Sequence, residues 1–279
     1  MIVGCAGLRI RVRPKIPDAG QTVSRCSPPL IRAPAHHFHA PRRPSGFNTI
    51  ISTMNGMKEI AKLGQRLVLL PERAVFWMQA KMLIVADPHF GKAQVFRDCG
   101  IPIPGGTTAA DINRLSSLME QLQPDELLVL GDLMHGRIDG GRKFSATVDT
   151  WRQRWSGTLI TLVTGNHDLR AGPPPAPFRL DRIVAQHVYG PFVFSHKAQT
   201  TNSRSRYTIA GHEHPAVFVS GKGHQREILP CFCFGDKRAL LPAFGSFTGN
   251  QVIRPEPQER VYAVAGDEVV EVALGPRKK

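Results

Sequence analysis

Residues 81–92 read Lys81-Met-Leu-Ile-Val-Ala-Asp87-Pro-His89-Phe-Gly-Lys92, and this stretch predicts how the chain folds. An apolar run of five residues, 82–86, ends in a carboxylate, a proline and an imidazole. A run without alternation favours a strand that is buried on both faces of a central sheet. Proline has no N–H to donate to a neighbouring strand, so we expect the strand to end there. Asp87 and His89, two apart in an extended backbone, would then point to the same side.

Four more apolar runs downstream also end in residues of the kinds that bind metals. These endings are Gly131-Asp132-Leu-Met-His135, Gly165-Asn166-His167-Asp168, Ser195-His196 and Gly211-His212-Glu-His214. The carboxyl ends of strands in an open α/β sheet lie at the edge where ligands bind. Glycine precedes three of the four because it lets the backbone turn sharply and approach an ion. Any single ending could be a solvated turn, but five in one chain indicate a metal site.

The composition restricts the class of protein. A chain of 279 residues, of which 42% are hydrophobic, suits one domain with an additional segment. Five cysteines without a regular framework favour a reducing compartment, and we interpret Cys231 and Cys233 as buried thiols rather than a metal pair. No apolar run approaches the ~18 residues of a membrane span, so no membrane partner is expected.

Positive charge is found in both parts of the chain. The formal net charge is +14, and residues 1–53, with eight Arg or Lys and one Asp, contribute half of it. The surplus on residues 54–279 favours an anionic partner, nucleic acid first, although a protein of simply high isoelectric point would look similar. Residues 1–53 hold seven prolines and show no hydrophobic period, so we expect a disordered basic arm. The composition of this arm would be explained if the true start of the protein were Met54 or Met57, or if the arm were a transit peptide.

The remaining pattern predicts a βαβ unit and a second sheet. Strands at 67–70 and 74–77 form a hairpin beside the first motif, and the glycines and prolines of residues 91–106 favour an open loop. Thr108 and Asp111 form a capping box for a helix that ends before Pro124. Trp151 and Trp155, four apart, share a helix face that we expect to contact the core. Several short strands after Ile228 suggest a second, mixed or antiparallel sheet.

The five motifs, present in this order across residues 87–214, resemble those of the calcineurin-like metallophosphoesterases. The Phe96-Arg97 pair, residues 100–107 and residues 241–249 resemble one bacterial branch, the ligase-associated DNA damage response endonucleases. The resemblance covers about residues 63–273. It implies an α/β fold, a four-layer αββα sandwich of two packed mixed sheets with flanking helices. It also implies a bacterial cytoplasmic protein that associates with a DNA ligase and a helicase.

The resemblance further implies a site for two divalent metal ions. The ligands would be Asp87, His89, Asp132 and His214 for one ion, and Asp132, Asn166, His196 and His212 for the other. Oxygen and imidazole ligands suit Mn²⁺ first, with Fe²⁺ or Zn²⁺ as alternatives. Two ions ~3.5–4 Å apart can share a hydroxide that attacks the phosphate in line.

Other residues of the motifs are candidates for catalysis and substrate binding. His167 takes the position of the family's proton donor to the leaving oxygen, and Asp168 is expected to orient or charge its imidazole. Lys92 and Arg97 could reach a substrate phosphate or be solvated loop charges, and His135 would contact substrate or a ligand.

The predicted function is a metal-dependent phosphodiesterase that cuts DNA in the DNA damage response. One alternative is a small-molecule phosphatase or nucleotide pyrophosphatase that uses the same site. A second, from another class, is a non-catalytic nucleic-acid scaffold. The complete set of ligand-type residues argues against the scaffold, since a decayed site should have lost at least one.

Overall fold

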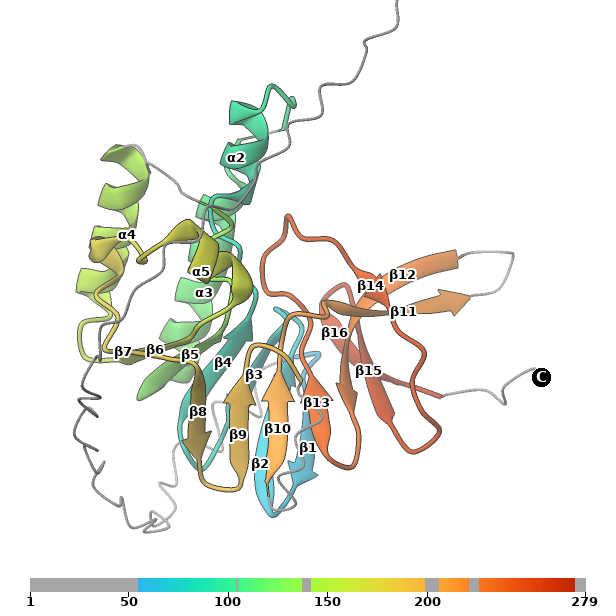
Figure 1. Ribbon diagram of the computed structural model, residues 1–279. Coiled ribbons are helices and arrows are strands. Elements are labelled where there is room, and N and C mark those ends of the chain that lie inside the picture. Colours follow the sequence, from blue (N-terminus) through green and yellow to red (C-terminus); the bar gives the residue numbers. More distant parts are fainter. Residues whose placement is uncertain (1–54, 104, 137–141, 199–205, 221–225, 274–279) are drawn as a thin grey trace, which may run out of the picture. The chain divides into compact units, whose positions relative to one another are not determined.

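The computed structural model describes residues 55–103, 105–136, 142–198, 206–220 and 226–273. Two mixed sheets pack on each other, and the main helices lie against the first (Figure 1). This confirms the predicted fold class of two packed mixed sheets with flanking helices. The predicted arm, residues 1–53, lies outside the described residues and stays a prediction. No helix in the described ranges is both long and apolar enough to cross a membrane.

The first sheet contains the strand from which the prediction began. Its strands, in spatial order, are β1 (Lys58–Lys62), β2 (Gln65–Leu70), β3 (Ala74–Trp77), β4 (Met82–Ala86), β5 (Glu126–Leu130), β6 (Leu159–Val163) and β7 (Arg182–Val184). Neighbours are antiparallel from β1 to β4 and parallel from β4 to β7. Strand β4 is buried at every position, as its unbroken apolar run predicted. The hairpin beside it is confirmed, although β1 lies outside β2 at the edge.

The second sheet is built from the last part of the chain. Its strands are β8 (Gln186–Tyr189), β9 (Phe192–Ser195), β10 (Tyr207–Ala210), β11 (Pro215–Ser220), β12 (Arg226–Phe234), β13 (Arg238–Leu240), β14 (Gln251–Val252), β15 (Arg260–Ala265) and β16 (Glu268–Val272). The order is β14-β11-β12-β13-β10-β9-β8, and β15 pairs with β12 and β16. The parallel pairs β9–β10 and β10–β13 place their carboxyl ends together, next to those of β4 and β5 (Figure 1).

The helices lie on the side of the first sheet, and the two longest cover its face. They are α2 (Lys92–Asp98), α3 (Thr107–Leu122), α4 (Arg142–Arg154), α5 (Asn166–Ala171) and the 3-10 turn η1 (Ala176–Phe178). The predicted βαβ unit is confirmed as β4–α3–β5, with parallel strands. Leu115 of α3 and Trp151 of α4 are buried in the core on this face, and Trp155 packs against it. The prediction that the two tryptophans face the core is therefore confirmed.

Two local predictions about the segment before α3 are wrong. Part of the expected open loop is helix α2. The capping box does not form: Gly106 precedes α3 with φ 94°, and no side chain caps this helix. Thr108 instead accepts a hydrogen bond from the N–H of Gly91 (3.1 Å), and Asp111 binds Ser246. Tertiary partners thus take both side chains that the local pattern assigned to the helix end.

A second core cluster fills the space between the two sheets. Trp77 lies within it, fully buried, and its ring meets those of Phe192 and Tyr189 edge-on with centroids at 4.9 and 5.5 Å. Such pairs contribute about 0.5–1.5 kcal/mol beyond the area they bury. On the other face of the second sheet, Cys231 and Cys233 are buried, and burial raises the pKa of both thiols. The interpretation as buried thiols is confirmed.

Candidate metal centre

The five predicted motifs meet where β4, β5, β6, β9 and β10 end. Three residues from three of these motifs show how closely the side chains approach. The Nε2 atom of His89 lies 3.7 Å from Oδ2 of Asp132, and Nε2 of His196 lies 3.6 Å from the same oxygen. The fold therefore gathers residues more than a hundred positions apart into one cluster.

The cluster consists of two groups, and Asp132 of the second group lies beside the first. The first group contains Asp87, His89 and His214, whose ligand atoms all lie within 4.8 Å of one another. The second group, on the same criterion, is Asp132, His196 and His212. The amide oxygen of Asn166 lies 3.0 Å from Nε2 of His196 and so joins the second group. All seven predicted ligands are thus brought together, and Asp132 lies between the groups.

Left-handed backbone, rather than strand geometry, aims several of these side chains. Asp87 and His89 have φ values of 50° and 47°, so the expected extended backbone between them is wrong. Asp132, His212 and His214 also have positive φ, at 48°, 69° and 45°. Each non-glycine residue in this region costs of order 1 kcal/mol, and such strain gathers at functional sites. Five strained residues in one cluster mark it as a functional centre.

The glycines that precede the ligands permit contacts that no other residue would allow. A Cβ on Gly165 would lie 2.1 Å from Oδ1 of Asp132, and one on Gly211 would lie 2.5 Å from Oδ2 of Asp87. Gly131 has φ 75°, and a Cβ there would lie 2.0 Å from Nδ1 of His196. The prediction of close backbone approach is confirmed for all three.

The charges of the cluster fit a bound cation. Asp87 is fully buried, and its Oδ1 has no hydrogen-bond partner among the described residues. Burial, with repulsion from Asp132 and Asp168, raises the pKa of Asp87 well above its usual value. Burial, with repulsion from His214, lowers the pKa of His89 to about 2, so this imidazole is neutral. Buried carboxylates beside neutral imidazoles need positive charge, and divalent cations supply it.

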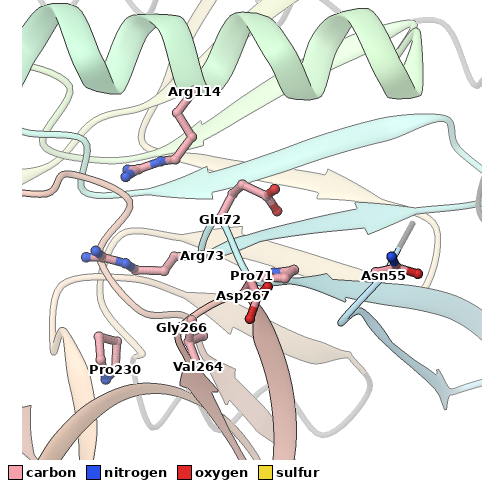
Figure 2. A pocket seen from close by; sticks show the side chains of 9 residues that line it. All are labelled: Asn55, Pro71, Glu72, Arg73, Arg114, Pro230, Val264, Gly266 and Asp267. Carbon is pink, nitrogen blue, oxygen red and sulfur yellow. The ribbon is translucent and has the colours of Figure 1, made fainter. Parts of the chain in front are cut away.

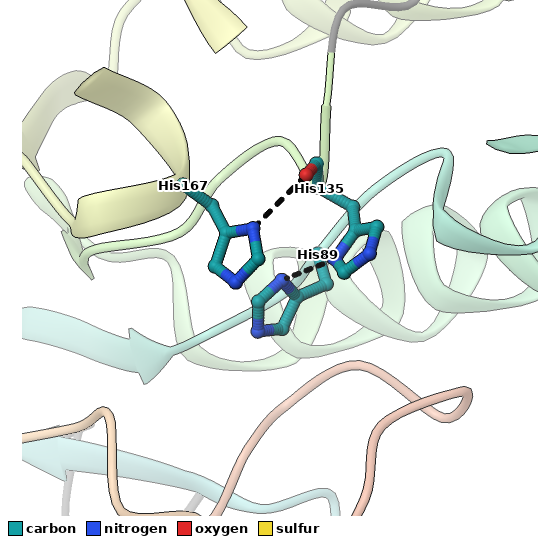
Figure 3. Close-up of side chains that lie close together, drawn as sticks. All are labelled: His89, His135 and His167. Carbon is teal, nitrogen blue, oxygen red and sulfur yellow. Dashed lines mark hydrogen bonds between the residues drawn. The ribbon is translucent and has the colours of Figure 1, made fainter. Parts of the chain in front are cut away.

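The contacts of Asp168 differ from the prediction. Its carboxylate accepts hydrogen bonds from the backbone N–H groups of Gly165 (2.9 Å) and Met134 (3.2 Å). The ring of His167 has its Nδ1 3.1 Å from the carbonyl oxygen of His135 instead, as Figure 3 shows. Backbone donors of two loops thus occupy the carboxylate that was expected to orient the imidazole. Asp168 holds those loops together, and the His135 carbonyl orients His167.

His135 belongs to a group of three imidazoles with His89 and His167. Its ring stacks on that of His167 with centroids at 4.7 Å, and its Nδ1 lies 3.3 Å from Nδ1 of His89 (Figure 3). Burial, with repulsion from Lys92 and His167, lowers the pKa of His135 to about 4. At neutral pH the His135 ring is therefore uncharged.

The two predicted substrate cations have different surroundings. Lys92 is half-buried, and its positive charge interacts with the negative charge of Asp132. Burial is the largest cause that lowers the pKa of His89, and repulsion from His214 and then from Lys92 lowers it further. Arg97 donates to Oε1 of Gln94 on its own helix (2.6 Å) and to the carbonyl of Ile103 (3.4 Å). The cluster therefore has Lys92 beside it, whereas Arg97 ties its own helix to the next loop.

The sequence reasoning missed a lysine on the other side of the cluster. Lys197 is exposed and follows His196 directly. Burial lowers the pKa of His212, and the positive charge of Lys197 is the next largest cause that lowers it. Its position next to a ligand motif was the signal available in the sequence.

It also missed a brace behind the cluster, which we define as Arg73, Asp111 and Arg114. Figure 2 shows Arg73 and Arg114 extending from different elements along the same pocket. Buried Asp111 pairs with Arg114 (3.0 Å) and accepts from the N–H of Ser246 (3.1 Å), while Arg114 donates to the carbonyl of Phe244. Arg73 donates weakly to two further carbonyls of the same loop, both at 3.4 Å.

The loop that the brace holds, residues 241–249, contacts two of the predicted ligands. The N–H of Gly245 donates to the carbonyl of Asp87 (3.3 Å), and Nδ1 of His214 lies 3.1 Å from the carbonyl oxygen of Gly249. A histidine whose other nitrogen meets a carbonyl is fixed in orientation, as metal-binding histidines usually are. The brace therefore supports the first group of the cluster from behind.

Comparison with known proteins gives a family. The model of the calcineurin-like phosphoesterases matches residues 80–213. The crystal structure of Pseudomonas putida nuclease MPE is similar at 34% sequence identity, covering 77% of this chain and 100% of that chain with a TM-score of 0.67. The phosphoesterase Yfce from E. coli is matched at 13% identity over 70% of this chain and 99% of that one, with a TM-score of 0.35. A search of curated proteins found no match.

Proposed function

Because the chain belongs to the calcineurin-like phosphoesterase family and is a metal-dependent hydrolase, we propose that its substrate is DNA, which it cuts at phosphodiester bonds. The observation that carries the proposal is the similarity to a nuclease over the whole length of that nuclease. The net charge of +14 supports it, since a basic protein attracts a polyanion.

We assign the seven clustered residues to two divalent cations, Mn²⁺ first, with Fe²⁺ or Zn²⁺ as alternatives. Asp87, His89 and His214 would hold one, Asn166, His196 and His212 the other, and Asp132 would contact both. When bound, two such ions activate water at neutral pH and neutralise the charge of the phosphate. A buried oxygen of Asp87 that has no hydrogen-bond partner among the described residues, 3.4 Å from Nδ1 of His196, supports this assignment.

The protein's own groups would position the phosphate and move the proton. Lys92 lies at the start of α2 beside the cluster, where its ammonium would contact a phosphate oxygen. His167 is half-exposed, with its Nε2 4.0 Å from Oδ2 of Asp132. This nitrogen faces the cluster and would give its proton to the leaving oxygen. Asp168 would act as a positioning residue through the two loops that it joins.

We further propose that the protein acts in DNA repair together with a DNA ligase and a helicase. Support comes from the loops at residues 100–107 and 241–249, which resemble the ligase-associated endonuclease branch. Co-purification of tagged protein with a ligase or helicase from its own host, repeated in the presence of a nuclease that removes bridging DNA, would test this.

The test of the main proposal compares three substrates. Purified protein with Mn²⁺ should nick supercoiled plasmid, cut an oligonucleotide and hydrolyse bis(p-nitrophenyl) phosphate, and a chelator should abolish all three activities. His167→Ala should slow DNA cleavage more than hydrolysis of the activated ester, whose leaving group needs no proton. A protein that hydrolyses nucleotides or phosphomonoesters well but never nicks DNA would instead be a small-molecule phosphatase.

A further inference from the structure

Four half-buried rings form a row that leads outward from the metal cluster. We call His167, His135, Phe96 and Phe247 the aromatic row. The centroid of Phe96 lies 6.2 Å from that of His135, and Phe247 meets Phe96 edge-on at 5.6 Å with an angle of 89°. His135 in turn lies 5.2 Å from the predicted ligand His89. The row therefore begins at the cluster and ends in two apolar rings.

Phe96 and Phe247 are accessible, although each lies on a segment that also carries a phenylalanine buried in the core. Phe90, just before α2, and Phe244, in the braced loop, are only 3% and 0% exposed. Phe96 and Phe247 remain partly exposed on the same two segments. Apolar area left in water forgoes ~25 cal/mol per Å² of stabilisation. A pair of such rings in mutual contact at a catalytic centre indicates a ligand surface rather than core.

The segments that carry these rings are fixed on the cluster. The N–H of His135 donates to the carbonyl of Phe90 (3.3 Å), so the loop after β5 is tied to the segment that leads into α2. The loop that carries Phe247 is held by hydrogen bonds between Ser246 and Asp111. The backbone of both segments is thus held in place, which lowers the cost of ordering the rings around a ligand.

Helix α2 presents a cation and a ring on the same face. Lys92 and Phe96 are four residues apart, and such positions are neighbours on a helix surface. Lys92 lies beside the cluster, since its backbone N–H donates to the carbonyl of the predicted ligand His89 (3.1 Å). A nucleotide likewise joins an anionic phosphate to a flat ring through a short linker. A phosphate at Lys92 and the cluster would therefore place the attached base near Phe96.

We propose that Phe96 and Phe247, together with His135, stack against the base next to the phosphate that is cut. The proposal rests on the proposed function and names these rings as its substrate-binding residues. Stacking on aromatic side chains tolerates every base, because each has a π-face. The row would therefore favour substrates that carry bases without selecting a sequence.

The test uses two single-stranded oligomers of equal length and charge. One is oligothymidylate, and the other has abasic tetrahydrofuran linkages throughout. Wild-type protein with Mn²⁺ should cut oligothymidylate with the higher kcat/KM. Phe96→Leu and Phe247→Leu should each lower that value by about 5- to 100-fold, the equivalent of one stacked base, and leave the abasic oligomer unaffected. Phe96→Tyr should retain the preference.

A matched control is Phe218→Leu, which removes a phenylalanine that is 52% exposed on β11 and lies outside the aromatic row. It should change neither oligomer's kcat/KM. Equal losses on both oligomers in the Phe96 and Phe247 variants would overturn the proposal, because the rings would then support the fold or the metals. Unchanged cleavage of oligothymidylate would overturn it as well.

A wild-type protein that cuts neither oligomer would contradict the proposed function, and binding then decides the role of the rings. Fluorescence anisotropy with the same two oligomers should show that wild type prefers oligothymidylate and that the two Leu variants lose this preference. Equal affinity of wild type for both oligomers, or binding to neither, would overturn the stacking proposal.

Discussion

The two carboxylate oxygens of Asp132 have different partners. Oδ1 accepts a hydrogen bond from the N–H of His167 (2.8 Å), and Oδ2 lies 3.6 and 3.7 Å from His196 and His89. Asp132→Asn keeps the shape and removes the charge, so it should weaken both metal positions. We expect elemental analysis to show less bound metal, and turnover to fall by more than about 100-fold. Asp149→Asn, at an exposed ion pair, is the control; wild-type metal content in the Asp132 variant would contradict the bridging role.

A substitution at Gly165 tests how closely the backbone must approach Asp132. The added methyl of Gly165→Ala would lie 2.1 Å from Oδ1, so the carboxylate or the loop must move. We expect metal affinity to fall by about ten-fold or more, measured by titration of the metal-free protein. Gly157→Ala, where nothing lies within 4 Å of the new Cβ, should change stability by less than about 0.5 kcal/mol. Equal metal affinity in the two variants would show that the contact is unimportant.

At this scale the sequence predicted which residues gather but not how each is oriented. Each of the seven ligand-type residues belongs to a motif that follows an apolar strand, and the resemblance to the calcineurin-like metallophosphoesterases selected these seven among the residues of the motifs. Their left-handed backbone, as at Asp87 and His89, was not predicted, since only the surrounding structure holds non-glycine residues there. Asp168 was expected to orient or charge the imidazole of His167, but its carboxylate accepts from the N–H of Gly165 within the same turn.

At the scale of elements, strands were predicted better than helix ends. Strand β4 (Met82–Ala86) was predicted with both ends correct because its apolar run lies between the polar residues Lys81 and Asp87. Helix α2 was missed because Gly91, Gly100 and the prolines around it favour a loop locally. The role of Asp111 could not be deduced, since its partner Ser246 lies 135 positions away. Local rules assigned it to a cap that tertiary contacts replaced.

The brace offers a prediction at the same scale. Asp111→Ala would leave Arg114, whose guanidinium is mostly buried, without its carboxylate, and would free Ser246. Loss of one partner of a buried pair costs about 3–5 kcal/mol. We expect a lower melting temperature and weaker metal binding, partly restored in Asp111→Asn, which keeps an oxygen acceptor. The control is Glu120→Ala, on the exposed face of the same helix, which should alter neither. Unchanged metal affinity in Asp111→Ala would limit the brace to stability.

At the scale of the molecule, His187 of β8 and Glu126 of β5 link the two sheets. Nε2 of His187 lies 4.0 Å from Oε1 of Glu126, which also pairs with Arg182 (3.5 Å). Burial lowers the pKa of His187 from 6.5, and the attraction of Glu126 opposes part of that shift. The unfolded chain then binds the proton more readily than the folded one, so this residue reduces stability as the pH falls below 6.5.

His187→Phe removes that titration and keeps a flat ring against Tyr189 and Phe194. We therefore expect the variant to gain stability relative to wild type between pH 8 and pH 5.5, measured by urea unfolding at both. Tyr189→Phe, as the control, should shift stability by the same amount at the two pH values. A stability difference between His187→Phe and wild type that does not change with pH would contradict the assigned titration.

The basic charge of the whole chain gives the last prediction, which separates a nuclease from a small-molecule phosphatase. A polyanion that contacts several cations releases counterions on binding, so its affinity should fall by orders of magnitude between about 50 and 200 mM salt. A small diester contacts the site through one phosphate, and its hydrolysis should persist over that range. Lys92→Gln and Lys197→Gln should each reduce the slope of log affinity against log salt by about one.

Lys58→Gln, on β1, is the matched control for that series. Its ammonium lies 4.0 Å from the carboxylate of Glu271, and β1 is the edge strand of the first sheet. The slope should stay at the wild-type value, because a cation that contacts no phosphate releases no counterion from DNA. If the Lys92→Gln and Lys197→Gln variants had the same salt slope as Lys58→Gln, DNA would not pass the cluster between Lys92 and Lys197. If salt affected DNA cleavage as little as it affects hydrolysis of the small diester, the protein would recognise only the phosphate at its centre.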